Sequence, residues 1–458
     1  MGARGRRGDD ARGGRPMIDW GALGDETVEL LRRYLQIDTT NPPGNEVAGA
    51  RFLAEILTRE GIASETIEAG PGRASLRARL PGDGSLGGIV LHHHIDVVYA
   101  DRRYWTVDPF GGVIADGYLY GRGAIDMKST GILHLAALLA LKRARVPLKR
   151  DLVFLATADE EAGSEFGAQF IADRRPDWLA GAEYAISEIG LIQMHSGLTA
   201  PLAAIVISEK TSLPITLTAR GEPGHGSMPW PDTAPNRLVR ALDRLLAAER
   251  PPRVLPEVQE FFSRMAAVLP AEHAVGYDDL AGSLRDPAFR ERFYANRQYA
   301  AMVRTTFAVT MLRGSAKSNV IPPEATAQID CRMLAGDDPE EIAEWVRRAV
   351  ADPNVQVQFA RDPKVPNLSP PDTELYKAMA DTLRRRAPGA VVAPMILVAF
   401  TDNWVFRRAG LHGYGFSPFV IEEEELQRIH GNDERISLEN LREGVRAYTE
   451  LLLNVAGA

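Results

Sequence analysis

The order of hydrophobic and polar positions predicts alternating helices and strands over the first part of the chain. Apolar residues recur at helical spacing in the segments 25–35, 48–60 and 127–141. Strands are expected at 75–80, 89–94, 152–157 and 184–187, and the run at 152–157 is almost wholly apolar, as in a buried strand. Strands that alternate with helices favour a mostly parallel sheet covered on both faces. The predicted fold class is therefore α/β.

The pattern changes near residue 207 and returns to its first form near residue 373. The intervening order is strand, helix, two strands, helix and strand, with the first five of these elements expected at 215–220, 236–248, 305–312, 325–333 and 339–351. This order predicts a small α+β, ferredoxin-like domain inserted into the main one. The expected division is a disordered tail at 1–16, a main domain in two parts at 17–207 and 363–458, and an inserted domain at 208–362.

Residues 251–304 add partly helical sequence within the inserted segment. An apolar stripe there comprises Phe261, Phe262, Met265, Val268 and Leu269. Local packing is the favoured interpretation. The alternative is that the stripe forms a wall of a substrate pocket.

Composition excludes several classes of protein. The 458 residues are 45% hydrophobic and 25% charged, as in an ordinary globular protein. A net charge of -8 argues against a general nucleic-acid binder. The single cysteine, Cys331, excludes an internal disulfide framework and a cysteine-built metal site. No apolar run approaches the roughly 18 residues of a membrane span, and residues 1–16 lack the apolar core of a secretory signal. We therefore expect a cytoplasmic protein without a membrane contact.

Acids and histidines gather where the predicted strands end. His94 and Asp96 follow one strand, Glu160 and Glu161 follow the next, and Glu188 follows a third. Ligands bind beyond the carboxyl ends of strands in such sheets. Two further residues fit this set, namely Asp126, where a glycine-rich loop turns into a helix, and His430, in the loop 428–434. A lone acid beside glycines is usually a turn residue or helix cap, so the argument depends on the whole set.

Two neutral imidazoles and three carboxylates suit one or two divalent ions. The candidate ligands are His94, Asp126, Glu161, Glu188 and His430. Zinc is the favoured metal, with cobalt or manganese as alternatives. Asp126 can place one oxygen on each of two ions and so bridge them.

The remaining acids can support this site. Asp96 faces the same side as His94 and can orient its imidazole. Glu160 can turn to a bridging water as general base while Glu161 binds metal. The alternative for this acidic pair is a solvated loop surface.

The chain resembles metallopeptidase family M20, which contains aminoacylases, carboxypeptidases and N-acyl-amino-acid hydrolases. The resemblance spans nearly all of 25–453. It rests on motifs in family order: 94–96, 120–128, 159–161, 224–229, 318–323 and 429–431. Two departures stand out. Ile189 intervenes between Glu188 and Gly190, and Asn403-Trp404 replace a common Ala-Arg after Thr401-Asp402.

The resemblance implies a role for each matched residue. His94 and Glu188 would share one ion, Glu161 and His430 the other, and Asp126 would bridge them. His225, on a lid domain, would polarise the substrate carbonyl, entering the partner subunit's site in dimeric relatives. Asn319 and Arg332 would contact the substrate, with Arg332 holding a carboxylate.

The function expected is that of a co-catalytic metal-dependent amidohydrolase. Its substrates would be N-acyl amino acids or short peptides with a free carboxylate, and a homodimer would form through the lid domain. The 251–304 segment resembles the carboxypeptidase S and N-acyl-amino-acid hydrolase branch more than the desuccinylase branch. Two alternatives stay open: an aminopeptidase or dipeptidase of the same family, and a non-catalytic ligand-binding member.

Overall fold

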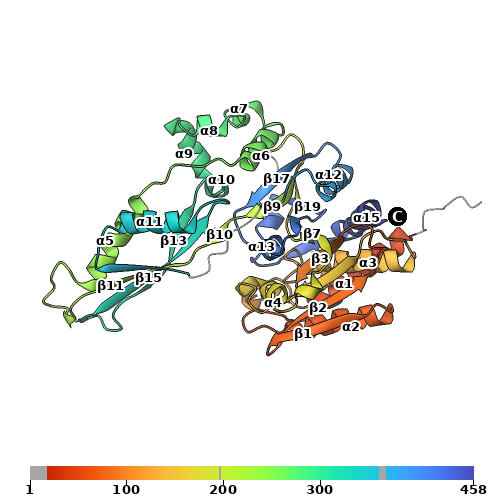
Figure 1. The fold of residues 1–458 in the computed structure, drawn as a ribbon, viewed down its shortest axis with the longest axis horizontal. Coiled ribbons are helices and arrows are strands. Elements are labelled where there is room, and N and C mark those ends of the chain that lie inside the picture. The colour runs from red at the N-terminus through yellow and green to blue at the C-terminus, as the bar shows by residue number, and fades with distance from the viewer. Residues whose placement is uncertain (1–17, 195–196, 361–367) are drawn as a thin grey trace, which may run out of the picture.

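A computed structural model describes residues 18–194, 197–360 and 368–458 and arranges them around two main sheets (Figure 1). The expected tail at 1–16 and the boundary at 363 lie outside the described residues. The larger sheet has ten strands in the order β1-β2-β6-β3-β7-β18-β9-β8-β19, with β17 paired to β9. They are β1 (Ser64–Gly70), β2 (Arg73–Leu80), β3 (Gly88–His94), β6 (Leu152–Thr157), β7 (Ala182–Ser187), β8 (Ile192–Met194), β9 (Leu202–Glu209), β17 (Val391–Leu397), β18 (His412–Gly415) and β19 (Val420–Glu422).

The centre of this sheet is parallel. β3 pairs in parallel with β6 and β7, and β7 pairs in parallel with β18. His94 lies opposite Thr157, so β3 and β6 end at the same level. The residues that follow β3, β6 and β7 therefore emerge together at one edge of the sheet.

Helices cover both faces of the larger sheet, which explains why its central strands β3 and β6 are buried throughout. Ile89 and Leu91 pack into a core shared with α1 (Trp20–Leu35), α2 (Glu46–Arg59), α3 (Lys128–Arg143), α12 (Glu374–Arg386) and α15 (Leu438–Ala456). Val90 and Val153 point the other way, toward α4 (Ala168–Arg174) and α13 (Asn403–Arg408). The predicted α/β class with a mostly parallel sheet is confirmed.

The second sheet is antiparallel and lies apart from the first, as Figure 1 shows. Its strands are β10 (Thr211–Ser212), β11 (Ile215–Arg220), β13 (Thr306–Arg313), β15 (Glu324–Met333) and β16 (Val355–Phe359). The helices α5 (Ala234–Ala247) and α11 (Pro339–Val350) share its apolar core. Two small sheets complete the described strands: β12 (Gly224–His225) with β14 (Val320–Ile321), and β4 (Val113–Ala115) and β20 (Arg435–Ser437) on either side of β5 (Tyr118–Tyr120).

The helices of 251–304 pack against the larger sheet rather than the second one. They are α6 (Pro256–Ala266), α7 (Ala271–Ala274), α8 (Leu280–Ser283), α9 (Pro287–Ala295) and α10 (Arg297–Met302). Phe262 and Met265 share a core with Val206 of β9 and Met395 of β17. These strands carry an apolar face that needs cover, and α6 supplies it. The contacts support packing as the role of the apolar stripe.

Phe262→Ala is expected to lower the free energy of unfolding by about 3–5 kcal/mol, the usual cost of deleting a buried phenyl ring. Phe262 is fully buried and its ring contacts those of Phe261, Tyr277, Phe293 and Tyr299. KM should stay unchanged. Denaturant unfolding and steady-state kinetics would measure the two effects. The matched control is Val275→Ala, because that side chain is 67% exposed. A raised KM with parental stability would instead favour a pocket wall.

Candidate active site

Asp126, two residues before the start of α3, lies between two imidazoles. Its Oδ1 is 3.1 Å from Nε2 of His94, and its Oδ2 is 3.1 Å from Nε2 of His430. Glu188, directly after β7, places Oε2 3.8 Å from Nε2 of His94. Glu161 places Oε2 3.3 Å from Nε2 of His430. Each Asp126 oxygen thus faces a different pair of side chains.

The cluster has the chemistry of a metal centre. Donor atoms of His94, Asp126 and Glu161 lie within 4.8 Å of one another, as do those of His94, Glu160 and Glu188. Within the described part of the chain, Oε1 of Glu161 is buried and has no hydrogen-bond partner. Imidazole nitrogens beside carboxylate oxygens suit zinc and similar divalent ions. The residues present therefore fit a metal pair.

The pKa shifts show how strongly the carboxylates crowd one another. Burial, followed by repulsion from Asp126, raises the pKa of Glu188 to about 8. Burial, followed by the charge of Glu188, raises the pKa of Glu160 well above its usual range. Hydrogen bonds to Asp126 and then Glu161 raise the pKa of His430 to about 10. A bound cation would favour the ionised carboxylates and the neutral imidazoles, opposing each of these shifts.

Asp96 positions the acidic pair more directly than it orients His94. Its Oδ1 accepts a hydrogen bond from the main-chain N–H of Glu160 at 3.2 Å, and its Oδ2 accepts one from Glu161 at 3.1 Å. Nδ1 of His94 lies 2.9 Å from the main-chain oxygen of Asp96 but 3.6 Å from its carboxylate. The main-chain carbonyl of Asp96, and not its carboxylate, therefore orients the His94 imidazole. The Asp96 carboxylate is turned toward the 3-10 turn η2 (Glu160–Ala162).

Ile189 does not displace Glu188 from the cluster. Ile189 and Gly190 both have positive φ, 65° and 78°, so the chain turns sharply after Glu188. A side chain on Gly190 would meet the main-chain oxygen of Gly415 at 2.2 Å, which explains the glycine there. The turn leaves Glu188 only 5% exposed at the end of β7.

Several buried residues that hold the site were not anticipated from the sequence. Asp159 is bound by Nη2 of Arg73 at 2.6 Å. Asp402 accepts hydrogen bonds from the hydroxyl groups of Thr157 and Ser164, on either side of η2. Glu434 binds the loop that carries Asp126. The only sequence signal for these roles was an acid beside a motif, in Asp159-Glu160-Glu161 and in Thr401-Asp402.

The three residues expected on a lid, His225, Asn319 and Arg332, do not belong to the cluster. His225 on β12 is exposed, and its Nδ1 lies 2.7 Å from Oγ of Ser227. Gly226 donates to the main-chain oxygen of Asn319 at 2.8 Å, so His225 and Asn319 are neighbours. In Figure 1 the chain runs outward from β10 along β11, so the loop after β11 lies at the outer end of the second sheet. Arg332, on β15 opposite Ser212 of β10, pairs with Asp330 at 2.9 Å.

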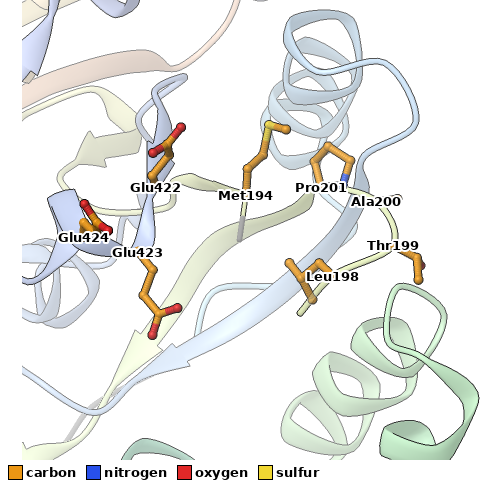
Figure 2. A pocket seen from close by; sticks show the side chains of 8 residues that line it. All are labelled: Met194, Leu198, Thr199, Ala200, Pro201, Glu422, Glu423 and Glu424. Atoms are coloured by element: carbon orange, nitrogen blue, oxygen red, sulfur yellow. The ribbon is translucent and has the colours of Figure 1, made fainter. Parts of the chain in front are cut away.

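A separate surface pocket of about 500 Å³ lies beside β8 and β19 (Figure 2). Figure 2 shows acidic side chains of 422–424 on one side and apolar ones on the other. The lining residues are Met194, Leu198, Thr199, Ala200, Pro201, Glu422, Glu423 and Glu424. None of the clustered acids or histidines lines it, so it is not part of the candidate site.

The chain belongs to peptidase family M20/M25/M40, whose model matches residues 90–454. It is 33% identical to the N-fatty-acyl-amino acid synthase/hydrolase PM20D1 of Xenopus tropicalis over 81% of this chain and 73% of that protein. It is 27% identical to human aminoacylase-1 over 93% of this chain and 94% of that one. The M20 family metallo-carboxypeptidase Sso-CP2 from Sulfolobus solfataricus shares the fold, with a TM-score of 0.70, 17% identity and coverage of 95% and 99%. The family resemblance predicted from the motifs is confirmed.

In the described part of the chain, no helix is both long and apolar enough to cross a bilayer.

Proposed function

We propose that this chain hydrolyses the amide bond of N-acyl amino acids or of short peptides with a free carboxylate. The single observation that carries the proposal is the position of Asp126, with one oxygen facing His94 and the other facing His430. The names of the relatives agree with it, since PM20D1 is a synthase/hydrolase of N-fatty-acyl amino acids and aminoacylase-1 is an acylase. A pure binding module has no need of Glu160 beside such a cluster.

The metal centre would be held by the residues described above. His94 and Glu188 would bind one ion, Glu161 and His430 the other, and Asp126 both. Zinc fits this donor set, with cobalt or manganese as alternatives. Two ions bound there would lower the pKa of a shared water and stabilise negative charge on the reacting oxygen.

Glu160 is the proposed general base. It is adjacent to Glu161 but belongs to the His94 and Glu188 side of the cluster. Glu160 Oε would take a proton from the attacking water and then deliver it to the nitrogen of the leaving amine. Asp96 would hold Glu160 in place through the main-chain N–H.

Substrate recognition would use the lid residues of a second copy of the chain. The loops that carry His225 and Asn319 are hydrogen-bonded to each other, and both side chains lie outside the Asp126 cluster, which suits a homodimer in which each lid reaches the other site. His225 would stabilise the developing oxyanion. Arg332 would hold the substrate carboxylate.

A panel of substrates with and without N-acylation tests this proposal. After loading with zinc, the chain should hydrolyse N-acyl amino acids and N-acylated short peptides with a free carboxylate much faster than dipeptides with a free amino terminus. The reverse preference would establish the aminopeptidase or dipeptidase alternative. Binding of the panel without turnover would establish the non-catalytic alternative. Initial rates of amine release measure all three outcomes.

A further inference from the structure

Glu434 is a fully buried acid that accepts four hydrogen bonds from one loop. Its Oε1 accepts from the main-chain N–H of Ile125 at 2.7 Å and of Asp126 at 3.0 Å. Its Oε2 accepts from the main-chain N–H of Gly123 at 3.1 Å and from Nη1 of Arg122 at 2.7 Å. The carboxylate therefore binds the loop directly at the residue that lies between the two imidazoles.

Arg122 and the main chain strengthen the same connection. Arg122 is 2% exposed, and its Nη2 donates to the main-chain oxygen of Gly431 at 2.6 Å. The N–H of Gly121 donates to the main-chain oxygen of Glu434 at 2.9 Å. Loop 121–126 is thus tied to both ends of 431–434, and His430 directly precedes that segment.

These ties join two candidate ligands that are about 300 residues apart in sequence. His430 needs such support because its side chain is 51% exposed, so packing alone does not fix the ring. A bridging carboxylate must hold each of its oxygens at the correct distance from a separate ion. Displacements of a fraction of an ångström in a functional site are enough to weaken it.

We propose that Glu434 is a positioning residue that fixes Asp126 relative to His430 and thereby sets the affinity of the ion that these two residues share. The inference rests on the proposed two-metal function. Glu434 touches neither imidazole in the contacts described above, so it acts through the loop and not as a ligand.

The four donors explain why a carboxylate is needed at this position. Glutamine would keep the shape but could accept with only one oxygen, and its NH₂ group would face N–H donors on the other side. Glu434→Gln should therefore shift the Asp126 loop. Loss of a group that orients a ligand typically costs about 10- to 100-fold in metal affinity or activity.

The test is calorimetric titration of the metal-free full-length chain with zinc alone, for the parental protein, Glu434→Gln and Glu425→Gln. Glu425 is the matched control because it is also a buried acid paired with arginine, at 2.6 Å from Arg435, in the preceding segment. We expect Glu434→Gln to bind one of its ions about 10- to 100-fold more weakly. Glu425→Gln should lose thermal stability while binding both ions with parental affinity.

Hydrogen exchange gives a second measurement that needs no metal. In the metal-free Glu434→Gln variant, the amides of Gly123, Ile125 and Asp126 should exchange faster, while those of β3 stay protected. Parental zinc affinity and parental exchange in a folded Glu434→Gln variant would overturn the inference. An equal loss of affinity in Glu425→Gln would also overturn it, because the effect would then follow general stability.

The substrate panel separates this inference from the proposed function. A parental chain that binds two zinc ions but hydrolyses no amide refutes the function, while the zinc affinities still decide the role of Glu434. In an active chain, kcat should fall in Glu434→Gln with little change in KM, because Glu434 is fully buried and contacts the Asp126 loop rather than the proposed substrate-binding residues.

Discussion

Glu160→Gln is expected to keep its metal and lose about 10²- to 10⁴-fold in kcat, the usual cost of removing a general base. Glutamine preserves the side-chain shape and leaves the main-chain N–H that donates to Asp96. It removes the only atom we assign to proton transfer. Burial, followed by the charge of Glu188, raises the pKa of Glu160 well above its usual range, and bound metal would oppose that shift. Metal analysis and steady-state kinetics on the same sample measure both quantities.

The matched control for this variant is Glu165→Gln. Glu165 lies in the same loop but is exposed, so Glu165→Gln should change neither the metal content nor kcat. A Glu160→Gln enzyme with bound metal and parental kcat would show that another group moves the proton. Loss of metal from Glu160→Gln would instead indicate that Glu160 is the metal ligand and Glu161 the general base.

His430→Ala is expected to lower metal content and activity together, from about two ions per chain to about one, with kcat reduced to near background. His430 supplies the only imidazole on its side of Asp126 in the described cluster, and Glu161 alone is a weak substitute. Because its side chain is half exposed, the substitution should leave stability nearly unchanged. Metal analysis after dialysis, with thermal unfolding alongside, is the measurement.

His273→Ala provides the comparison for His430→Ala. His273 is exposed in α7, so its loss should change neither metal content nor rate. Full activity of His430→Ala with two ions bound would remove His430 from the ligand set.

The central strands could be predicted because they are buried on both faces. Leu152–Thr157 is a continuous apolar run, and the structure begins and ends β6 at the same residues. Such strands also deliver their next residues to one edge, so His94, Glu161 and Glu188 could be grouped before their distances were known. The alternation of Ile215–Arg220 predicted β11 for a related reason, since only one of its faces packs on α5 and α11.

Elements and residues that depend on distant partners could not be predicted in the same way. β1 is mostly exposed at the edge of the sheet, so its sequence lacks an apolar pattern. β9 runs past the change of pattern at 207. Its end could not be predicted locally, since its partner β17 lies nearly two hundred residues later. Nothing local in 251–304 indicates that α6 covers these two strands. Glu434 stands four residues after His430, but only the folded loop shows that it binds Asp126.

The measurement that tests the central claim most directly is a zinc titration of the metal-free chain in which binding and hydrolysis of an N-acyl amino acid are followed together. The account predicts about two zinc ions per chain and full activity only when both are bound, as a co-catalytic pair requires. Exposure to a chelator should abolish the activity and zinc should restore it. Full hydrolysis by the metal-free chain would contradict the account. So would full activity in a chain whose bound zinc lies elsewhere than at the Asp126 cluster.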